Sequence, residues 1–165
     1  GSVVYAGSLN QLMFPSLGLG FLLVPPHMVN LYIRARQYAG EQLSVHLQRA
    51  IAEFIQEGHL DRHIKRLRGV YSDRRNALVQ AMTEHLGGKC GIVNTGAGVF
   101  VLARFKSKYN DAEIVERARK HGVGLVSSKS FYLVRAPRNE FILGTANLTE
   151  EEIFEGVRRL AKILG

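Results

Sequence analysis

Residues 7–21 read GSLNQLMFPSLGLGF, and this stretch decides how the chain folds. It follows a short apolar run at residues 3–6 and includes the start of a second one at residues 19–24, and glycine and proline bound both runs. Apolar runs of this length indicate buried strands, so we expect two parallel neighbouring strands in a covered sheet. Pro25 and Pro26 are expected to end the second strand, because proline has no backbone N–H to pair.

The segment after these prolines predicts three helices. Apolar residues at helical spacing place them at about residues 27–38, 43–56 and 60–85. Glycine favours helix C-termini because it accepts a left-handed backbone. We therefore expect the helices to end at Gly40, Gly58 and the Gly87-Gly88 pair.

The second half of the chain alternates strands with helices. Strands are expected at residues 92–94, 99–105, 123–126 and 141–143. One helix is expected to run from the N-cap Asn110 through His121, and a last helix is expected to open at a capping box of Thr149 and Glu152. The order strand, strand, helix, strand, strand, helix predicts an α/β layer of helices on a sheet.

Length and composition place the chain among globular proteins. It has 165 residues, 46% of them hydrophobic, which is enough for one compact domain with a core. No apolar run approaches the roughly 20 residues that span a bilayer, and no secretory signal is visible. Cys90 is the single cysteine, so no internal disulfide can form. We expect a cytoplasmic protein without membrane contact, with Cys90 as a buried structural thiol rather than a reactive one.

The chain is basic, with a formal charge of +8. Many of the cations lie between residues 59 and 75, where Leu60, Ile64, Leu67 and Tyr71 recur at helical spacing. This pattern favours an amphipathic helix with a solvated basic face. A basic face can also meet nucleic acid. Because no winged helix-turn-helix, zinc-finger or RNA-binding signature is present, direct DNA binding by this chain is not expected.

The opening stretch resembles the segment that carries the cofactor lysine in pyridoxal-phosphate aminotransferases of fold type I. It is most similar to the C-terminal aminotransferase-like domain of MocR-type regulators of the GntR family, where the segment reads roughly G-S-F-S-K-T-L-F-P-x-L-R-L-G-Y. Residues 47–71, 122–132 and 143–153 resemble later parts of the same domain in the same order. The resemblance implies an α/β fold in which the C-terminal small domain of a fold-type I aminotransferase is joined to two remnant strands of the large domain.

The same resemblance implies a division into residues 1–26 with the remnant strands, residues 27–87 as a helical interdomain segment, and residues 88–165 as the small α/β domain. The chain is then a degenerate copy or a fragment, and the rest of the large domain lies upstream. Most cofactor contacts of the family belong to that upstream part, and the DNA-binding domain of the regulators lies further upstream still.

The site residues of the family are replaced at three positions. Gln11 stands at the Schiff-base lysine, Gly18 at the phosphate-binding arginine, and Ile142 at the arginine that clamps the substrate carboxylate. An amide cannot form the Schiff base that pyridoxal chemistry requires, and neither glycine nor isoleucine can pair with an anion. Ser8 is retained and can either hydrogen-bond a phosphate or serve as a turn residue. We expect no catalytic residue and no cofactor in this chain, although pyridoxal phosphate is the cofactor of the family.

Other candidate groups are weaker. Lys129 could be a substitute amine, but it follows a small-domain strand and lies far from the usual lysine. His59 and His63 are four residues apart, a spacing that suits a metal. No carboxylate or cysteine completes a ligand set, so we expect a surface pair and no metal.

The sequence thus predicts a non-catalytic aminotransferase-like domain with a regulatory or dimerisation role. The alternative is a fragment of a pyridoxal-phosphate-dependent aminotransferase that completes its site with a partner. Two strands without their sheet leave open edges and an apolar surface, which a partner usually covers. We therefore expect a homo-oligomer, most simply a two-fold dimer that meets through residues 3–24.

Overall fold

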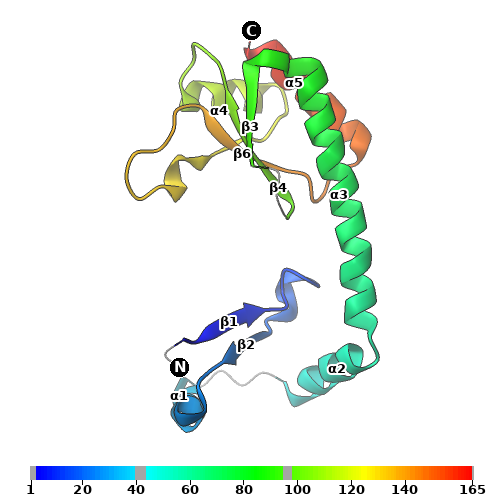
Figure 1. The fold of residues 1–165 in the computed structure, drawn as a ribbon, viewed down its shortest axis with the longest axis vertical. Coiled ribbons are helices and arrows are strands. Elements are labelled where there is room, and N and C mark those ends of the chain that lie inside the picture. The colour runs from blue at the N-terminus through cyan, green and yellow to red at the C-terminus, as the bar shows by residue number, and fades with distance from the viewer. Residues whose placement is uncertain (1–2, 40–43, 95–97, 165) are drawn as a thin grey trace. The chain divides into compact units, whose positions relative to one another are not determined.

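The computed structural model describes residues 3–39, 44–94 and 98–164 (Figure 1). The chain forms two compact units, Gly1–Lys65 and Arg66–Gly165, which are described separately below. Both units combine helices with strands, which confirms the α/β class. The boundary between the units falls inside the segment predicted to be helical, residues 27–87, and the three-part division of the chain stays a prediction.

Unit 1 begins with a β-hairpin rather than with parallel strands. β1 (Tyr5–Ser8) pairs antiparallel with β2 (Gly20–Leu23), and Ser8 lies opposite Gly20. The expectation of parallel neighbours was wrong because of the connection between them. Parallel strands need a crossover of a dozen or more residues, usually a helix. Here the connection holds only the short 3-10 turn η1 (Pro15–Leu17).

The two strands are also exposed, not covered as predicted. Apart from Gly7, every residue of the hairpin strands is exposed in this chain. A two-stranded hairpin has no further strands beside it, and few other elements pack on its faces to bury them. The small core of unit 1 lies beside it instead, where Leu9 and Leu17 of the connection pack with Ile51.

The helices of unit 1 end where the sequence indicates. The 3-10 turn η2 (Pro26–Met28) leads into α1 (Val29–Ala39), and α2 (Val45–Gln56) follows the N-cap Ser44. Gly58 takes a φ of 72°, the left-handed conformation that suits glycine at a helix end. The predicted break at Gly40 and the predicted helix start at residue 43 lie outside the described residues.

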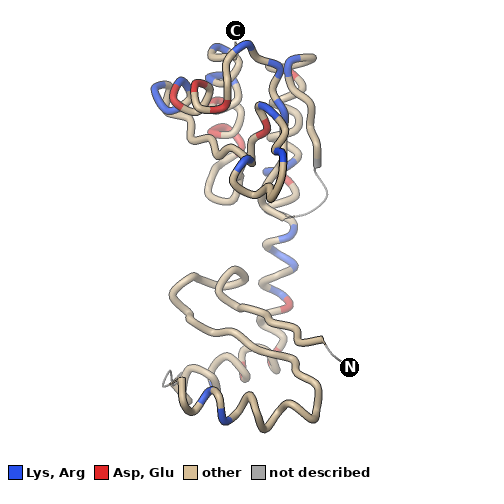
Figure 2. The backbone as a smooth tube through the Cα atoms, turned by 90° about the vertical axis from the view of Figure 1, so that its left-hand side faces the viewer, with Lys and Arg blue, Asp and Glu red and all other residues tan. Residues whose placement is uncertain are grey.

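α3 (His59–Leu86) confirms the predicted long helix and its end at Gly87, where η3 (Gly87–Lys89) begins. Its last turns are buried in the core of unit 2, through Ala77, Leu78, Ala81, Met82 and Leu86. Its earlier turns carry an exposed row of cations (Figure 2) and a partly buried apolar stripe. The amphipathic pattern predicted for residues 60–71 is therefore present.

Unit 2 holds a four-stranded antiparallel sheet in the order β3-β4-β6-β5. The strands are β3 (Cys90–Asn94), β4 (Phe100–Phe105), β5 (Val126–Ser127) and β6 (Glu140–Gly144). β5 is shorter than the strand predicted at residues 123–126. The N–H of Val123 donates to the Ala118 carbonyl at 2.9 Å, so this part of the segment caps the preceding helix instead of joining the sheet.

Helices α3, α4 (Asp111–Lys120) and α5 (Glu150–Leu164) contribute the rest of the core of unit 2. Alternate side chains of β4 and β6 face this core, and the rings of Phe105 and Phe141 stack with centroids 5.4 Å apart. The predicted N-cap at Asn110 and the predicted capping box at Thr149 are both present, and Asn110 forms a capping box with Glu113 as well. The remnant strands and the small α/β domain expected from the resemblance are thus both found.

Because Phe141 is fully buried at the centre of this core, Phe141→Ala should leave a cavity and lower the free energy of unfolding of unit 2 by about 3–5 kcal/mol. Urea denaturation followed by far-UV circular dichroism measures this. Phe131→Ala is the matched control, since that ring is 70% exposed and its loss should change little. Equal effects of the two substitutions would contradict the packing described here.

Candidate functional site

The connection between β1 and β2 is fixed at its base. The N–H of Leu9 donates to the Leu19 carbonyl at 3.0 Å, and the N–H of Leu19 donates to the Asn10 side chain at 3.1 Å. Leu9 and Leu17 are buried in the small core, so they anchor the connection from within. Gln11 lies between these anchors with an exposed side chain. Gln11 is therefore exposed to solvent in a loop whose ends are held by hydrogen bonds and by buried leucines.

This loop offers no amine. Gln11 is neutral, and the first lysine of the whole sequence is Lys65, at the end of unit 1. A Schiff base to an aldehyde requires a primary amine, which an amide does not supply. The residues of this loop thus do not fit a covalently held pyridoxal phosphate.

Gly18 has a backbone reason to be glycine. Its φ is 64°, in the left-handed region, and it ends the turn η1. A Cβ at this position would meet nothing within 4 Å, so space is open there. A side chain such as arginine is disfavoured by the backbone conformation and not by crowding, at a cost of about 1 kcal/mol.

Ser8 already takes part in the turn. Its hydroxyl accepts a hydrogen bond from the N–H of Asn10 at 3.2 Å. This is the contact of a turn residue, the second of the two roles considered for Ser8. A phosphate contact at Ser8 stays a prediction.

His59 and His63 of α3 have separate partners. Nδ1 of His59 accepts from Arg62 at 2.8 Å, so its Nε2 carries the proton and donates to Glu57 at 2.9 Å. His63 contacts the Leu12 carbonyl through Nε2 at 2.9 Å and so ties α3 to the loop that bears Gln11. Over residues 3–39, 44–94 and 98–164, no three His, Cys, Asp or Glu side chains gather as metal ligands.

Ile142 and Lys129 belong to unit 2. Ile142 is half-buried on β6, opposite Leu102 of β4, and points to the face of the sheet away from the core. Lys129 lies in the 3-10 turn η4 (Ser128–Phe131), where its N–H donates to the Ser127 hydroxyl. Neither residue belongs to the unit that holds Gln11.

A buried carboxylate occupies the same face of β6. Glu140 is 0% exposed, and its Oε2 accepts from Arg104 at 2.8 Å. Its Oε1 accepts from the hydroxyls of Ser128 and Tyr132, each at 2.8 Å. Burial alone raises the pKa of the Glu140 carboxyl, but the three donors and the Arg104 charge together lower it below its usual value. Glu140 therefore stays ionised and binds the segment after β5 to the sheet.

Sequence reasoning missed this network. Its one signal is an acidic residue directly before the apolar run Phe141-Ile142-Leu143, where a charge needs a partner if it is buried. The partner Arg104 lies on another strand, 36 residues earlier, so spacing along the chain does not reveal it.

Cys90 behaves as the sequence suggested. It lies half-buried on β3 and packs against the core of unit 2. Burial raises the pKa of the Cys90 thiol to about 11, so at neutral pH it carries its proton. A protonated thiol is a poor nucleophile, which agrees with a structural role.

Comparisons with known proteins give relatives of two kinds, although no protein-family model matches the chain. It is 31% identical over 160 residues to the uncharacterized HTH-type transcriptional regulator YhdI of Bacillus subtilis. The aligned region covers 97% of this chain and 34% of that protein. It is also 31% identical to the probable rhizopine catabolism regulatory protein MocR of Rhizobium meliloti, over 97% of this chain and 32% of that one.

The fold matches a solved aminotransferase. The multiple substrate aminotransferase from Thermococcus profundus superposes with a TM-score of 0.87 at 27% identity, over 99% of this chain and 41% of that structure. The chain thus spans about a third of the length of the two regulators and two fifths of the enzyme. Separately, no helix among the described residues has both the length and the apolar character needed to cross a bilayer.

The Glu140 network gives a test by pH. Because the pKa of the folded carboxyl lies below its ordinary 4.5, its contribution to stability is present above that value and is lost as the pH falls through the folded pKa. Glu140→Gln should cost about 2 kcal/mol near neutral pH, and this difference from the wild type should shrink below pH 4.5.

Urea denaturation at several pH values measures both effects. Glu116→Gln is the control, since Glu116 forms only exposed ion pairs, with Arg119 and Lys120, and their loss should not change stability measurably. A difference between wild type and Glu140→Gln that stays constant down to low pH would show that Glu140 is not an ionised partner.

Proposed function

Since the chain is a relative both of MocR-type regulators and of fold-type I aminotransferases, we propose that it is a non-catalytic aminotransferase-like domain with a regulatory or dimerisation role. It resembles the effector part of a MocR-type regulator, a role that implies a cytoplasmic location. Direct contact with DNA is left to another domain of such a protein.

The observation that carries this proposal is the side chain at position 11. The loop between β1 and β2 keeps its anchors, Leu9 and Leu17, while the position of the Schiff-base lysine holds an exposed Gln11. An enzyme of this type uses the lysine amine both to hold its cofactor and to move protons at the substrate carbon. A domain with only a regulatory or dimerisation role does not require that amine.

The replacements at Gly18 and Ile142 support the same conclusion. The left-handed backbone at Gly18 favours glycine over a phosphate-binding arginine. Ile142 contributes apolar surface where a carboxylate would need a guanidinium. Three separate contacts are then absent, namely those to the cofactor aldehyde, the cofactor phosphate and the substrate carboxylate.

The alternative is a fragment of a pyridoxal-phosphate-dependent aminotransferase. It is favoured by the fold of the Thermococcus profundus enzyme, which this chain shares over almost its whole length. In that case a partner would have to supply the cofactor contacts, and another lysine of the complex would have to replace Gln11.

The surface of unit 1 supports dimerisation. Leu22 and Leu23 of the hairpin and Leu31 and Ile33 of α1 are each more than half exposed. A cavity of about 730 Å³ lies among apolar side chains of the hairpin and α1. Exposed apolar surface of this kind is usually covered by a partner. We propose a two-fold homodimer that meets through residues 3–24.

The absence of an amine in the loop can be tested with the cofactor itself. On addition of pyridoxal phosphate, followed by borohydride, we expect no stable visible absorbance and no lysine labelled in preference to the others. Spectroscopy and peptide mapping by mass spectrometry measure this. A single labelled lysine, lost in Lys129→Gln if Lys129 is that residue, would instead favour the enzyme alternative.

The dimer is tested by sedimentation velocity over a range of concentrations. We expect association in the wild type and its loss in Leu23→Glu, because a charge in the exposed apolar surface of β2 cannot be buried without a partner. Leu133→Glu is the control, since Leu133 is fully exposed in unit 2 and should leave association unchanged. A wild-type chain that stays monomeric at high concentration rules the dimer out.

A further inference from the structure

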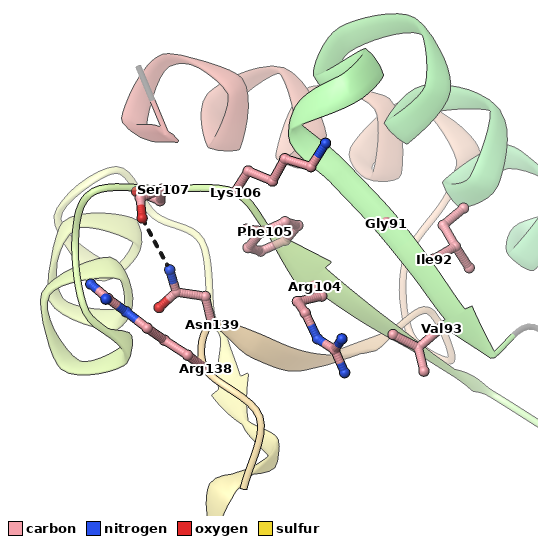
Figure 3. A pocket seen from close by; sticks show the side chains of 9 residues that line it. All are labelled: Gly91, Ile92, Val93, Arg104, Phe105, Lys106, Ser107, Arg138 and Asn139. Carbon is pink, nitrogen blue, oxygen red and sulfur yellow. Dashed lines mark hydrogen bonds between the residues drawn. The ribbon is translucent and has the colours of Figure 1, made fainter.

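A second cavity lies in unit 2, between the paired ends of β3 and β4 and the residues that enter β6 (Figure 3). Its volume is about 440 Å³, and its lining includes Arg104, Lys106, Ser107, Arg138 and Asn139. None of these residues takes part in the features that support the regulatory role. Any function of this cavity is therefore independent of that proposal.

The cavity is strongly basic. Arg104, Lys106 and Arg138 line it, and none of its lining residues is acidic. Arg104 is held in place because its Nη2 bonds the buried Glu140, while half of its side chain remains exposed. Among the described residues, Lys106 has no side-chain acceptor that would neutralise its charge. Glu140 offsets the charge of Arg104, so Lys106 and Arg138 give the cavity a net positive charge that attracts an anion.

Asn139 adds a feature that charge alone does not explain. It is 4% exposed, and its Nδ2 donates to the carbonyls of Ser107 and Tyr109 at 3.3 and 3.1 Å. Its backbone N–H donates to Asp111 at 2.9 Å. In contrast, its Oδ1 is buried and has no hydrogen-bond partner in the described part of the chain. Figure 3 shows the nitrogen turned to Ser107 and the oxygen turned away from it.

A buried acceptor without a donor is costly, and few are found in folded proteins. The two carbonyl partners of Nδ2 fix the orientation of the amide, because turning it over would place two acceptors against the oxygen. The Oδ1 atom can therefore accept a hydrogen bond from a donor outside the protein. The neighbouring Arg138 is exposed and is held by a single 3.4 Å bond to the Lys108 carbonyl, so its side chain can turn aside.

We propose that this cavity binds a small oxyanion that carries its own O–H donor, either a hydrogen phosphate group or a 2-hydroxy carboxylate. Arg104, Lys106 and Arg138 bind the negative oxygens, and the O–H of the ligand donates to Asn139 Oδ1. The shared chemistry is an acid group with a neutral hydroxyl beside it.

This arrangement selects against sulfate. Sulfate has nearly the size and charge of hydrogen phosphate, but at neutral pH it has no proton to donate. In the cavity it would leave Asn139 Oδ1 unpaired and would place a second acceptor, a sulfate oxygen, beside it. The same contrast separates lactate, which has a hydroxyl, from acetate, which has none.

The wild-type chain should be titrated by calorimetry with inorganic phosphate, sulfate, lactate and acetate at matched ionic strength. We expect phosphate to bind about tenfold more tightly than sulfate, or lactate about tenfold more tightly than acetate, as one hydrogen bond to a buried acceptor would give. A difference between phosphate and sulfate would identify the ligand as a phosphate group, and a difference between lactate and acetate would identify it as a 2-hydroxy carboxylate. Equal binding within both pairs, or no binding, overturns the proposal.

Variants locate the site. The double substitution Lys106→Gln and Arg138→Gln should weaken binding by about tenfold or more, whereas Lys162→Gln, which removes an exposed cation from α5 of the same unit, should leave it unchanged. If the double substitution and Lys162→Gln weakened binding equally, the anion would be attracted to the basic protein in general, and the proposed site would be wrong.

Asn139→Gly should abolish the preference for the hydroxyl-bearing ligand. Glycine suits the φ of 55° at this position, so the backbone is expected to be kept. If this variant does not fold, the wild-type comparison and the double substitution still decide the proposal.

Discussion

The antiparallel register of β4 with β6 supports everything else in unit 2. With Ala103 opposite Phe141 and Arg104 opposite Glu140, one face of the pair is apolar and the other carries an ion pair. A slip of one residue would exchange the two faces, placing the charges in the core. The hydrophobic core and the Glu140 network therefore both follow from a single register, which also brings Arg104 to the basic cavity.

In unit 1 the shape of the loop between β1 and β2 depends on residues other than Gln11. The connection between β1 and β2 is held by the backbone of Leu9 and Leu19, the side chain of Asn10 and the buried Leu17. None of these contacts uses the side chain at position 11 or 18. The side chain at position 11 can therefore vary while the loop keeps its shape, whereas position 18 favours glycine through its left-handed backbone.

Local signals predicted the helices of this chain well and its strands less well. The glycine at position 58 and the capping boxes at Asn110 and Thr149 act through neighbouring residues, so their positions can be read directly. Strand direction depends on a partner, and the short turn η1 allowed only a hairpin. The segment at residues 123–126 was predicted as a strand. The N–H of Val123 instead donates to the Ala118 carbonyl at the end of α4, so it does not pair in the sheet.

The sequence by itself determined the element order, the helix ends and the absence of an amine in the loop at Gln11, because each of these depends on residue type and near neighbours. Only the tertiary structure decided that Glu140 is a buried, ionised partner of Arg104 and that the Asn139 oxygen is left without a donor. Both results need residues about thirty or more positions apart to meet across a sheet and a loop. Burial and pairing here depend on contacts between residues far apart in the sequence, so no local sequence pattern predicts them.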